Sequence, residues 1–291
     1  MLWMLVQSLI NGLLSGGVYA LVAVGITIIF GVMKMINFAM GEFLMIGMYT
    51  TWIGYNLFGV NIYLLIPFVL LCMAAIALVC FRTCMFPILG KDSTASILVT
   101  VGLSFFLANL AQLIFGPDFR AVPSSIKTTS LEIGSFHIGL PRLIAMLTAF
   151  ALVMLVGYLL DKTLLGRAMR ATAEKAEVAQ MLGINAIRTY AFAFILGICM
   201  AGLTGLLLSP LYYAYPMAGA TYKIAPLMAV VLGGMGDIRG AFIGGMLIGA
   251  IESVIGTLVA PDLGPAGIFV LFLFVLYFKP QGLFGKGERV A

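Results

Sequence analysis

Long apolar runs separated by short polar segments dominate the chain. A helix needs about 20 apolar residues to cross the hydrocarbon core of a bilayer, and most of the runs approach or exceed this length. The chain has no strand-like alternation of the kind that indicates a membrane barrel. The pattern predicts eight membrane spans and one shorter apolar segment that crosses only partway. The spans are expected at about 5–32, 41–58, 62–82, 94–115, 142–160, 189–210, 241–258 and 264–279, and the shorter segment at about 222–236.

The composition supports the same class of protein. Of the 291 residues, 63% are hydrophobic and 9% are charged, whereas about 25% of the residues in a soluble domain are charged. The chain therefore lacks the polar residues to cover its surface in water. We expect an all-α fold: a polytopic transmembrane helical bundle with about 8-9 membrane segments, some of them broken or re-entrant. Residues 1–291 are predicted to form a single transmembrane domain.

The basic residues predict how the chain is oriented, because Lys and Arg accumulate in cytoplasmic loops. If the polar stretch 161–188 is cytoplasmic, twelve of the 16 basic residues lie inside. This orientation requires an N-terminus outside, a cytoplasmic C-terminus and an odd number of crossings. The 222–236 segment is then needed to connect the two sides. The four basic residues predicted outside are Arg120, Lys127, Arg142 and Lys223.

The most polar stretch, "LLGRAMRATAEKAEVAQMLGINAIRTYAFAF" (164–194), predicts a helix, a tight turn and a second helix that enters the membrane. Residues 165–182 are good helix formers, with weakly apolar positions at spacings of three and four. Gly183 is expected to end this helix in the left-handed conformation. Asn185 is expected to cap the next helix.

The small apolar face of this helix allows two interpretations. The helix could lie on lipid headgroups, but a face made mostly of alanine is too small to anchor well in lipid. A shallow face of small residues suits docking into a groove on a partner protein. On the opposite side, Arg170 and Glu174 are expected to form an exposed pair one turn apart. The residues predicted to couple this segment to a partner are Arg170, Glu174, Ala176, Ala179, Leu182, Gly183, Ile184 and Asn185.

Two apolar runs are interrupted by polar residues. The first, "MINFAMGEFLMIGMY" (35–49), contains Asn37 and Glu42, and an unpaired carboxylate that faces lipid is costly. Two interpretations stay open. In one, Asn37 caps a helix whose positive end attracts Glu42. In the other, the break lines the cytoplasmic mouth of a pathway and Glu42 forms an ion pair within a permease dimer.

The second interruption is "LGGMGDIRGAFIGG" (232–245). Its glycines permit sharp turns and close approach of helices. We expect either a cytoplasmic hairpin that shapes the exit of a pathway, with Asp237 and Arg239 as a candidate pair, or an ordinary tight loop. Taken with the first interruption, the candidate pathway and gate residues are Asn37, Gly41, Glu42, Gly233, Gly234, Gly236, Asp237 and Arg239.

Three ordered blocks of this sequence resemble the permease subunits of ABC importers for branched-chain and other hydrophobic amino acids. "GRAMRATAEKAEVAQMLGIN" resembles the cytoplasmic coupling segment of that family, expected here at about 161–188. "NGLLSGGVYALVAVGITIIFGVMKMINFAMGEFLMIGMY" (11–49) and "APLMAVVLGGMGDIRGAFIGGMLIGAIES" (225–253) are similar to its N-terminal and C-terminal signatures. One departure is Met40, at a position where the family often has a histidine.

The resemblance implies a transport subunit rather than an enzyme, located in the bacterial inner membrane and in contact with lipid. It would form a pathway with a second permease subunit, driven by two cytoplasmic ATP-binding cassette ATPase subunits. An extracytoplasmic binding protein would deliver a small amino-acid-like substrate. No cofactor or metal is expected in this chain, since ATP and Mg would bind the partner subunits, and no nucleic acid is expected. "LGKDS" (89–93) and "FGKGE" (284–288) both lack the residues of a phosphate-binding loop.

Two other classes of function are weighed against this one. A stand-alone secondary transporter or channel for a small hydrophobic solute usually carries an ionisable group in mid-span, and Glu252 is the clearest candidate. A membrane enzyme needs a cluster of catalytic side chains, whereas this chain has one histidine and scattered acids. Within the importer class, urea, amides or aromatic acids are alternative solutes.

Overall fold

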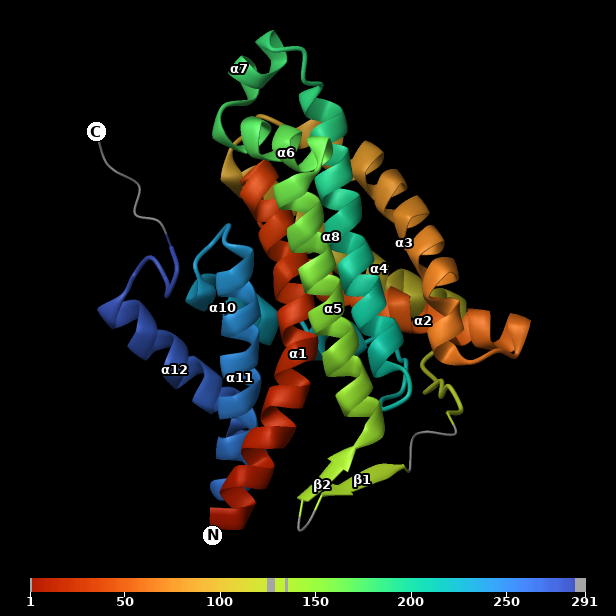
Figure 1. Ribbon diagram of the computed structural model, residues 1–291. Coiled ribbons are helices and arrows are strands. Elements are labelled where there is room, and N and C mark those ends of the chain that lie inside the picture. The colour runs from red at the N-terminus through yellow and green to blue at the C-terminus, as the bar shows by residue number, and fades with distance from the viewer. Residues whose placement is uncertain (1, 125–128, 134–135, 286–291) are drawn as a thin grey trace.

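A computed structural model of the chain describes residues 2–124, 129–133 and 136–285 (Figure 1). The helices are α1 (Leu2–Met33), α2 (Met40–Phe58), α3 (Ile66–Cys80), α4 (Ser93–Phe115), α5 (Leu140–Lys162), α6 (Leu164–Glu174), α7 (Ala176–Met181), α8 (Ala186–Leu208), α9 (Ala218–Thr221), α10 (Ile224–Gly233), α11 (Ile238–Leu258) and α12 (Gly264–Phe278). Short 3₁₀ or π turns extend α3 and α12, at Ile62–Leu65, Phe81–Met85, Phe86–Ile88 and Pro261–Leu263. The strands β1 (Ser130–Ile133) and β2 (Phe136–Gly139) form an antiparallel hairpin before α5.

The predicted all-α membrane bundle is confirmed. In the described part of the chain, seven helical segments are long and apolar enough to span a membrane, and they match seven of the eight predicted spans. They are Trp3–Met33, Ile62–Ile88, Thr94–Phe115, Leu140–Lys162, Ala186–Leu208, Ile238–Leu258 and Pro261–Phe278.

The eighth predicted span, 41–58, has a different role. A helix does form there, as α2, but it runs steeply across the long helices (Figure 1). More than half of its residues are buried, and it packs against α8, α9, α3 and α4. Its apolar residues therefore form part of the protein core, which hydropathy alone does not distinguish from a lipid-facing surface.

Small residues bring the central helices close together. α1 packs along α11, and a Cβ atom on Gly245 or Gly249 would overlap the backbone of α1 at Ala20 or Gly16. Such close approach increases van der Waals contact where the hydrophobic effect does not drive helices together. α1 and α8 are largely buried, whereas α5 and α12 are mostly exposed. The exposed helices are thus the ones available to lipid or a partner.

The chain folds back into the molecule after α1. Lys34 adopts a left-handed conformation, with φ 57°, which is unusual for a residue other than glycine. The following backbone runs beside α4, where the Thr100 hydroxyl donates to the Ile36 carbonyl at 3.3 Å. α2 therefore begins in the interior, and Met40 at its first position is only 1% exposed.

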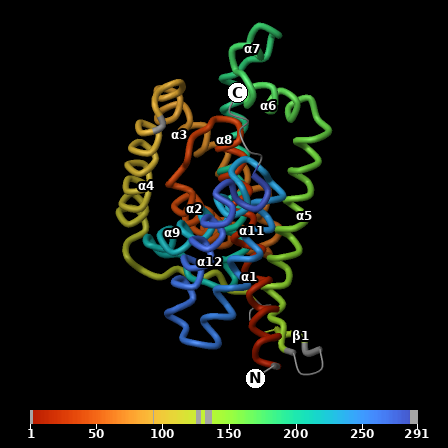
Figure 2. Tube along the Cα trace, turned by 90° about the vertical axis from the view of Figure 1, so that its left-hand side faces the viewer, coloured from red at the N-terminus to blue at the C-terminus, as the bar shows by residue number. Residues whose placement is uncertain are grey.

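A second re-entry follows α8. Residues 209–217 turn back from the end of α8, and α9 and α10 form one short apolar helical segment, Ala218–Gly233. Figure 2 shows α9 beside α4, at about half the height of the molecule. This segment agrees with the prediction of a shorter piece at 222–236. The start of α2 therefore lies in the protein interior, and α9 packs against it.

The two ends of the bundle carry different features. α6 and α7 project from one end of the bundle, which is also the end where the C-terminus of α1 lies (Figure 1). The N-terminus and the β1–β2 hairpin lie at the opposite end, where the Gln7 side chain donates to the His137 carbonyl at 2.7 Å. Gly285, the last described residue, lies beside the turn between α10 and α11. The described chain thus starts and finishes on opposite sides of the bundle.

Candidate functional site

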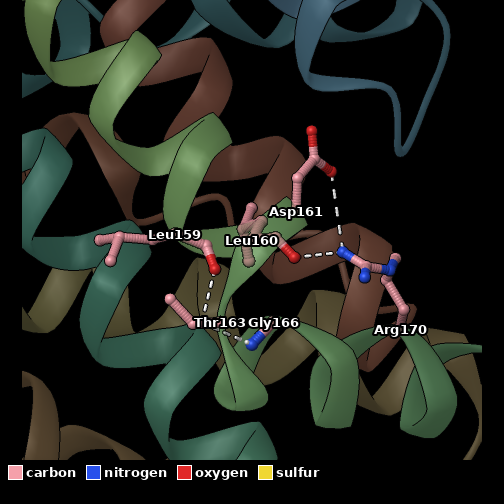
Figure 3. A network of polar contacts seen from close by, with 6 residues as sticks. All are labelled: Leu159, Leu160, Asp161, Thr163, Gly166 and Arg170. Atoms are coloured by element: carbon pink, nitrogen blue, oxygen red, sulfur yellow. Dashed lines mark hydrogen bonds and ion pairs between the residues drawn. The ribbon is translucent and has the colours of Figure 1, made fainter.

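A compact turn joins α5 to α6 (Figure 3). The Thr163 hydroxyl donates to the Leu159 carbonyl and accepts a hydrogen bond from the Gly166 backbone N–H at 3.1 Å, which makes Thr163 the N-cap of α6. A Cβ atom on Gly166 would overlap the carbonyl of Leu160. The turn therefore fixes the direction of α6 relative to α5.

Arg170 strengthens the same junction. Its guanidinium donates to the Leu160 carbonyl and lies 3.7 Å from the Asp161 carboxylate, at the end of α5 (Figure 3). A cation is favourable there, because the last carbonyls of a helix carry partial negative charge. Arg170 therefore points back toward α5, and the expected pairing with Glu174 is replaced by the ion pair with Asp161.

The predicted single helix over 165–182 is wrong. Lys175 has an extended backbone, with φ −150° and ψ 103°, and divides the segment into α6 and α7. The break lets α7 fold back so that Ala179 packs in the interior at 2% exposure. Intrinsic helix propensity favoured continuation, but tertiary packing decides the outcome.

The break also changes which side chains face outward. Ala179 was predicted to dock onto a partner, but its burial excludes it from the exposed surface. The exposed apolar side chains of α7 are larger: Val178 is 48%, Met181 86% and Leu182 75% exposed. These three residues, which we call the α7 tip, form an exposed apolar surface around the end of α7. Ala176, by contrast, is partly buried.

The turn into α8 follows the prediction closely. Gly183 is left-handed, with φ 83°. The Ile184 backbone N–H donates to the Ala179 carbonyl at 3.0 Å, which closes the turn. The Asn185 side chain accepts a hydrogen bond from the Arg188 backbone N–H at 3.0 Å and caps α8. α7 is therefore anchored at both ends, and its tip is held in a defined position.

Glycines shape the turn between α10 and α11. Gly234 and Gly236 have φ of 104° and 95°, a region that other residues rarely adopt. A Cβ atom on Gly233 would overlap the backbone of Gly240 across the hairpin. The Asp237 carboxylate accepts a hydrogen bond from the Gly240 backbone N–H at 2.8 Å and caps α11. The expected tight hairpin is therefore present.

Asp237 acts as a helix cap rather than as a partner of Arg239. Among the described residues, no ion pair joins these two side chains. The two residues lie close together in sequence, which suggested an ion pair. The Asp237 carboxylate instead points to a backbone N–H in the first turn of α11.

A cavity of about 420 Å³ joins the two regions predicted separately. α6 contributes Arg170, the end of α5 contributes Asp161, and the α10–α11 turn contributes Asp237 and Arg239. Residues 27–32 of α1 complete the wall. α6, the end of α5, α1 and the α10–α11 turn therefore border one shared cavity.

The first interrupted run lies deeper than expected. Asn37 is 3% exposed, and its side-chain oxygen accepts a hydrogen bond from the Ala39 backbone N–H at 2.9 Å. The N-cap position of α2 is Ala39, which has no side-chain cap. The prediction that Asn37 caps the second helix is therefore wrong, since it stabilises the turn just before it. Met40 is buried, and its sulfur lies 3.8 Å from the Asn37 amide nitrogen.

Glu42 forms an ion pair within this chain. Its Oε1 lies 2.8 Å from the ammonium of Lys223, which also donates to the Ser104 hydroxyl at 2.7 Å. Ser104 is the middle residue of α4. Glu42 was expected at a helix end or at the cytoplasmic mouth of a pathway, and Lys223 outside. The two re-entrant segments instead carry both side chains into the interior.

A second cavity, of about 330 Å³, adjoins this ion pair. α2, α4 and the region around α9 form its walls. Glu42, Lys223 and Ser104 line it, together with the amides Asn109 and Gln112 of α4. Both amides are exposed on α4, and polar side chains within a span usually face protein or a water-filled space rather than lipid.

Glycines hold the ion pair in place. Gly41 packs so closely against Gly219 that a Cβ atom on either residue would overlap the backbone of the other. This contact places the start of α2 against α9. Gly41 immediately precedes Glu42, and Gly219 lies four residues before Lys223. Gly41 is thus a packing residue that positions the polar groups.

A third cavity, of about 360 Å³, lies toward the N-terminal end. Glu252, the candidate relay residue, lines it opposite Arg142, along with Tyr19, Tyr212 and Tyr222. Among the described residues, no group of three or more His, Cys, Asp or Glu side chains could hold a metal ion. The arrangement resembles a polar vestibule more than a relay chain, because a single acid is present in it.

Comparison with known proteins gives a consistent result. Residues 8–276 match the family model described as the branched-chain amino acid transport system permease component. The chain is 30% identical to the high-affinity branched-chain amino acid transport system permease protein BraD of Pseudomonas aeruginosa, over 97% of this chain and 96% of the relative. The corresponding LivH protein of Escherichia coli K12 shows the same identity and coverage.

A more distant relative extends the comparison. The probable branched-chain amino acid transport permease protein LivH of Methanocaldococcus jannaschii is 26% identical, over 94% of this chain and 91% of the relative. No solved structure matches the chain. The full-length matches and the apolar helices agree with one another, and this multi-pass membrane protein belongs to the branched-chain amino acid transport system permease family.

Proposed function

We propose that this chain is the permease subunit of an ATP-driven importer for branched-chain or related amino acids. It forms the translocation pathway with a second permease subunit in the bacterial inner membrane. Two cytoplasmic ATPase subunits bind ATP and Mg and supply the work, and an extracytoplasmic binding protein delivers the substrate. This chain itself catalyses no reaction and carries no cofactor.

The observation that carries the proposal is the α7 tip, in a chain that matches the permease family along almost its full length. Apolar side chains that protrude from a charged segment at the end of a membrane bundle are costly unless a partner covers them. The segment from 161 to 188 is rich in basic residues, which supports a cytoplasmic position. A cytoplasmic ATPase is a partner that would reach it there.

The cavity between α6 and the α10–α11 turn supports a route for coupling. A push on the α7 tip would be transmitted through α6, because Arg170 and Thr163 fix α6 to α5. The α10–α11 turn, from Gly236 to Arg239, lies across the same cavity. Closure of the ATPases would then change the side from which the pathway is open.

The experiment is ATP-dependent uptake in proteoliposomes. The chain is reconstituted with its second permease, the two ATPases and the binding protein, and uptake of radiolabelled L-leucine is followed. Valine, isoleucine, urea and benzoate are added in excess as competitors. We expect uptake only with ATP and the ATPases, and competition by valine and isoleucine.

The same experiment decides between the alternatives. Leucine flux through this chain alone, without ATPases, would contradict the proposal and support a stand-alone transporter or channel. ATP-dependent uptake that is blocked by urea or benzoate, but not by valine or isoleucine, would keep the importer and change the solute.

A further inference from the structure

The ion pair between Glu42 and Lys223 is unusual for a purely structural contact. The Glu42 side chain is 4% exposed, and its second oxygen, Oε2, is buried without a hydrogen-bond donor among the described residues. Buried ion pairs lose much of their Coulombic gain to desolvation, and replacement by apolar residues is often neutral or stabilising. An unsatisfied carboxylate oxygen adds a further cost. Structural stabilisation alone does not account for this arrangement.

The surroundings of the pair suit a small zwitterion. Lys223 lies on the wall of the 330 Å³ cavity. Its ammonium group forms an ion pair with Glu42 and donates a hydrogen bond to Ser104. Ligand pockets for small molecules are about 300–1,000 Å³ and are mostly apolar with a few placed polar groups. Here Phe105, Ala108 and Met217 supply the apolar walls. The cavity can therefore accept an aliphatic side chain beside one anion and one cation.

The path of the chain places the pair where a substrate would pass. Both side chains lie at the starts of interrupted helical segments, Glu42 in the first turn of α2 and Lys223 just before α10. Substrate sites in transporters are commonly built where membrane helices are discontinuous, near the middle of the membrane. Here the pair adjoins Ser104, midway along α4.

Resting on the proposed function, we propose that the Glu42–Lys223 pair is a zwitterion-binding subsite of the translocation pathway. The substrate ammonium binds the Glu42 carboxylate, and the substrate carboxylate binds Lys223 and Ser104. Insertion of the zwitterion between the two side chains keeps every charge paired and the net charge of the site at zero. That balance is what transfer of an amino acid through a region of low dielectric constant requires.

Uptake by charge variants is the first test, in the proteoliposomes described above. Glu42→Gln should lower ATP-dependent L-leucine uptake by about tenfold or more, as expected for loss of a charge-assisted hydrogen bond. Asp92→Asn is the matched control, because it makes the same change at an exposed position outside the cavities. That control should retain wild-type uptake. Wild-type uptake in Glu42→Gln would overturn the proposal.

A double variant separates binding from folding. Glu42→Gln combined with Lys223→Gln leaves no buried unpaired charge, so it should fold even if one single variant does not. We expect a folded complex that hydrolyses ATP but imports leucine at least about tenfold more slowly. If the double variant imports leucine at the wild-type rate, the pair is structural only and the proposal is wrong.

Occupancy of the cavity by leucine is tested directly by cysteine alkylation, in a variant that keeps both Glu42 and Lys223. The native residues Cys72, Cys80, Cys84 and Cys199 are replaced by alanine, and Met217→Cys places one thiol on the cavity wall. L-leucine should slow its alkylation by N-ethylmaleimide. The matched probes 4-methylpentanoate and 3-methylbutylamine, which keep the side chain but carry one charge each, should not.

The outcomes distinguish this inference from the proposed function. Failure of the wild-type complex to import leucine would contradict the proposed function itself. Normal leucine uptake with no protection by leucine, or with equal protection by the singly charged probes, would contradict only the zwitterion subsite.

Discussion

At the scale of single residues, the polar centre of the protein depends on glycines that have no polar role. Gly41 and Gly219 allow α2 and α9 to touch, and this contact brings Glu42 within reach of Lys223. In a close-packed interior a single added methyl group displaces backbone, so the cost depends on whether the neighbours can move. Backbone on both sides of this contact leaves little room to move.

Gly41→Ala is therefore expected to destabilise the protein by about 1–3 kcal/mol and to lower the thermal unfolding midpoint in detergent. Gly102→Ala is the matched control. Gly102 also lies in a helix, but nothing lies within 4 Å of an added Cβ atom, so its midpoint should be unchanged or raised. Equal midpoints for Gly41→Ala and the wild type would show that the α2–α9 contact is not tight.

Asp237 provides a second prediction at this scale. Because its carboxylate caps α11, Asp237→Ala should cost about 0.5–2 kcal/mol of stability, whereas Asp237→Asn, which keeps a capping oxygen, should cost little. Thermal unfolding of the two variants measures the difference. If Asp237→Asn is as destabilising as Asp237→Ala, the negative charge matters rather than the cap.

Local sequence signals predicted some residues well and others not. Gly183 and Asn185 were predicted correctly, because a left-handed stop and a helix cap depend on neighbouring backbone only. The pairing of Glu42 with Lys223 was not predicted, because the position of each residue was inferred only from the end of the nearest predicted span. The spacing of polar residues in α4 offers the missing signal. Ser96, Thr100 and Ser104 recur every four residues and form a buried polar face of that helix.

At the scale of elements, α6 and α7 act as one rigid projection with an apolar end. Met181, at 86% exposure, is the most protruding apolar side chain of the α7 tip. Charge at the centre of a docking surface is costly when a partner covers it. A minority of interface residues, clustered in well-packed positions near the centre, cost more than about 1 kcal/mol when they are truncated.

Met181→Asp should weaken association with the ATPases by about tenfold or more and leave the permease folded. Copurification of the ATPases and stimulation of their activity are the measurements. Leu131→Asp, an exposed change in the hairpin at the opposite end, is the control and should have no effect on either. Unchanged ATPase association in Met181→Asp would remove the α7 tip from the interface.

The length of the apolar runs predicted the long helices and two interruptions, but neither the break at Lys175 nor the burial of α2. The runs that became α1, α4, α5, α8 and α11 are long enough to identify spans on length alone. The break at Lys175 has no local signal such as proline or glycine, and it accompanies the burial of Ala179. α2 was assigned to the membrane because an apolar run buried in protein looks the same as one buried in lipid.

At the scale of the whole molecule, the two re-entrant segments give the bundle its internal organisation. One enters from the end that carries α6 and α7, the other from the end that carries the hairpin, and both reach α4. A cavity lies toward each end and another beside the central ion pair. This arrangement fits a pathway opened alternately from two sides, with the ion pair between them.

The central claim is that α6 and α7 lie on the cytoplasmic side, where ATPases can act on them. In a variant without native cysteines, Met181→Cys and Leu131→Cys are labelled separately with a membrane-impermeant maleimide. Labelling is compared between intact spheroplasts and inverted membrane vesicles. The account predicts that Met181→Cys reacts only in inverted vesicles and Leu131→Cys only in spheroplasts, and the reverse pattern would contradict it.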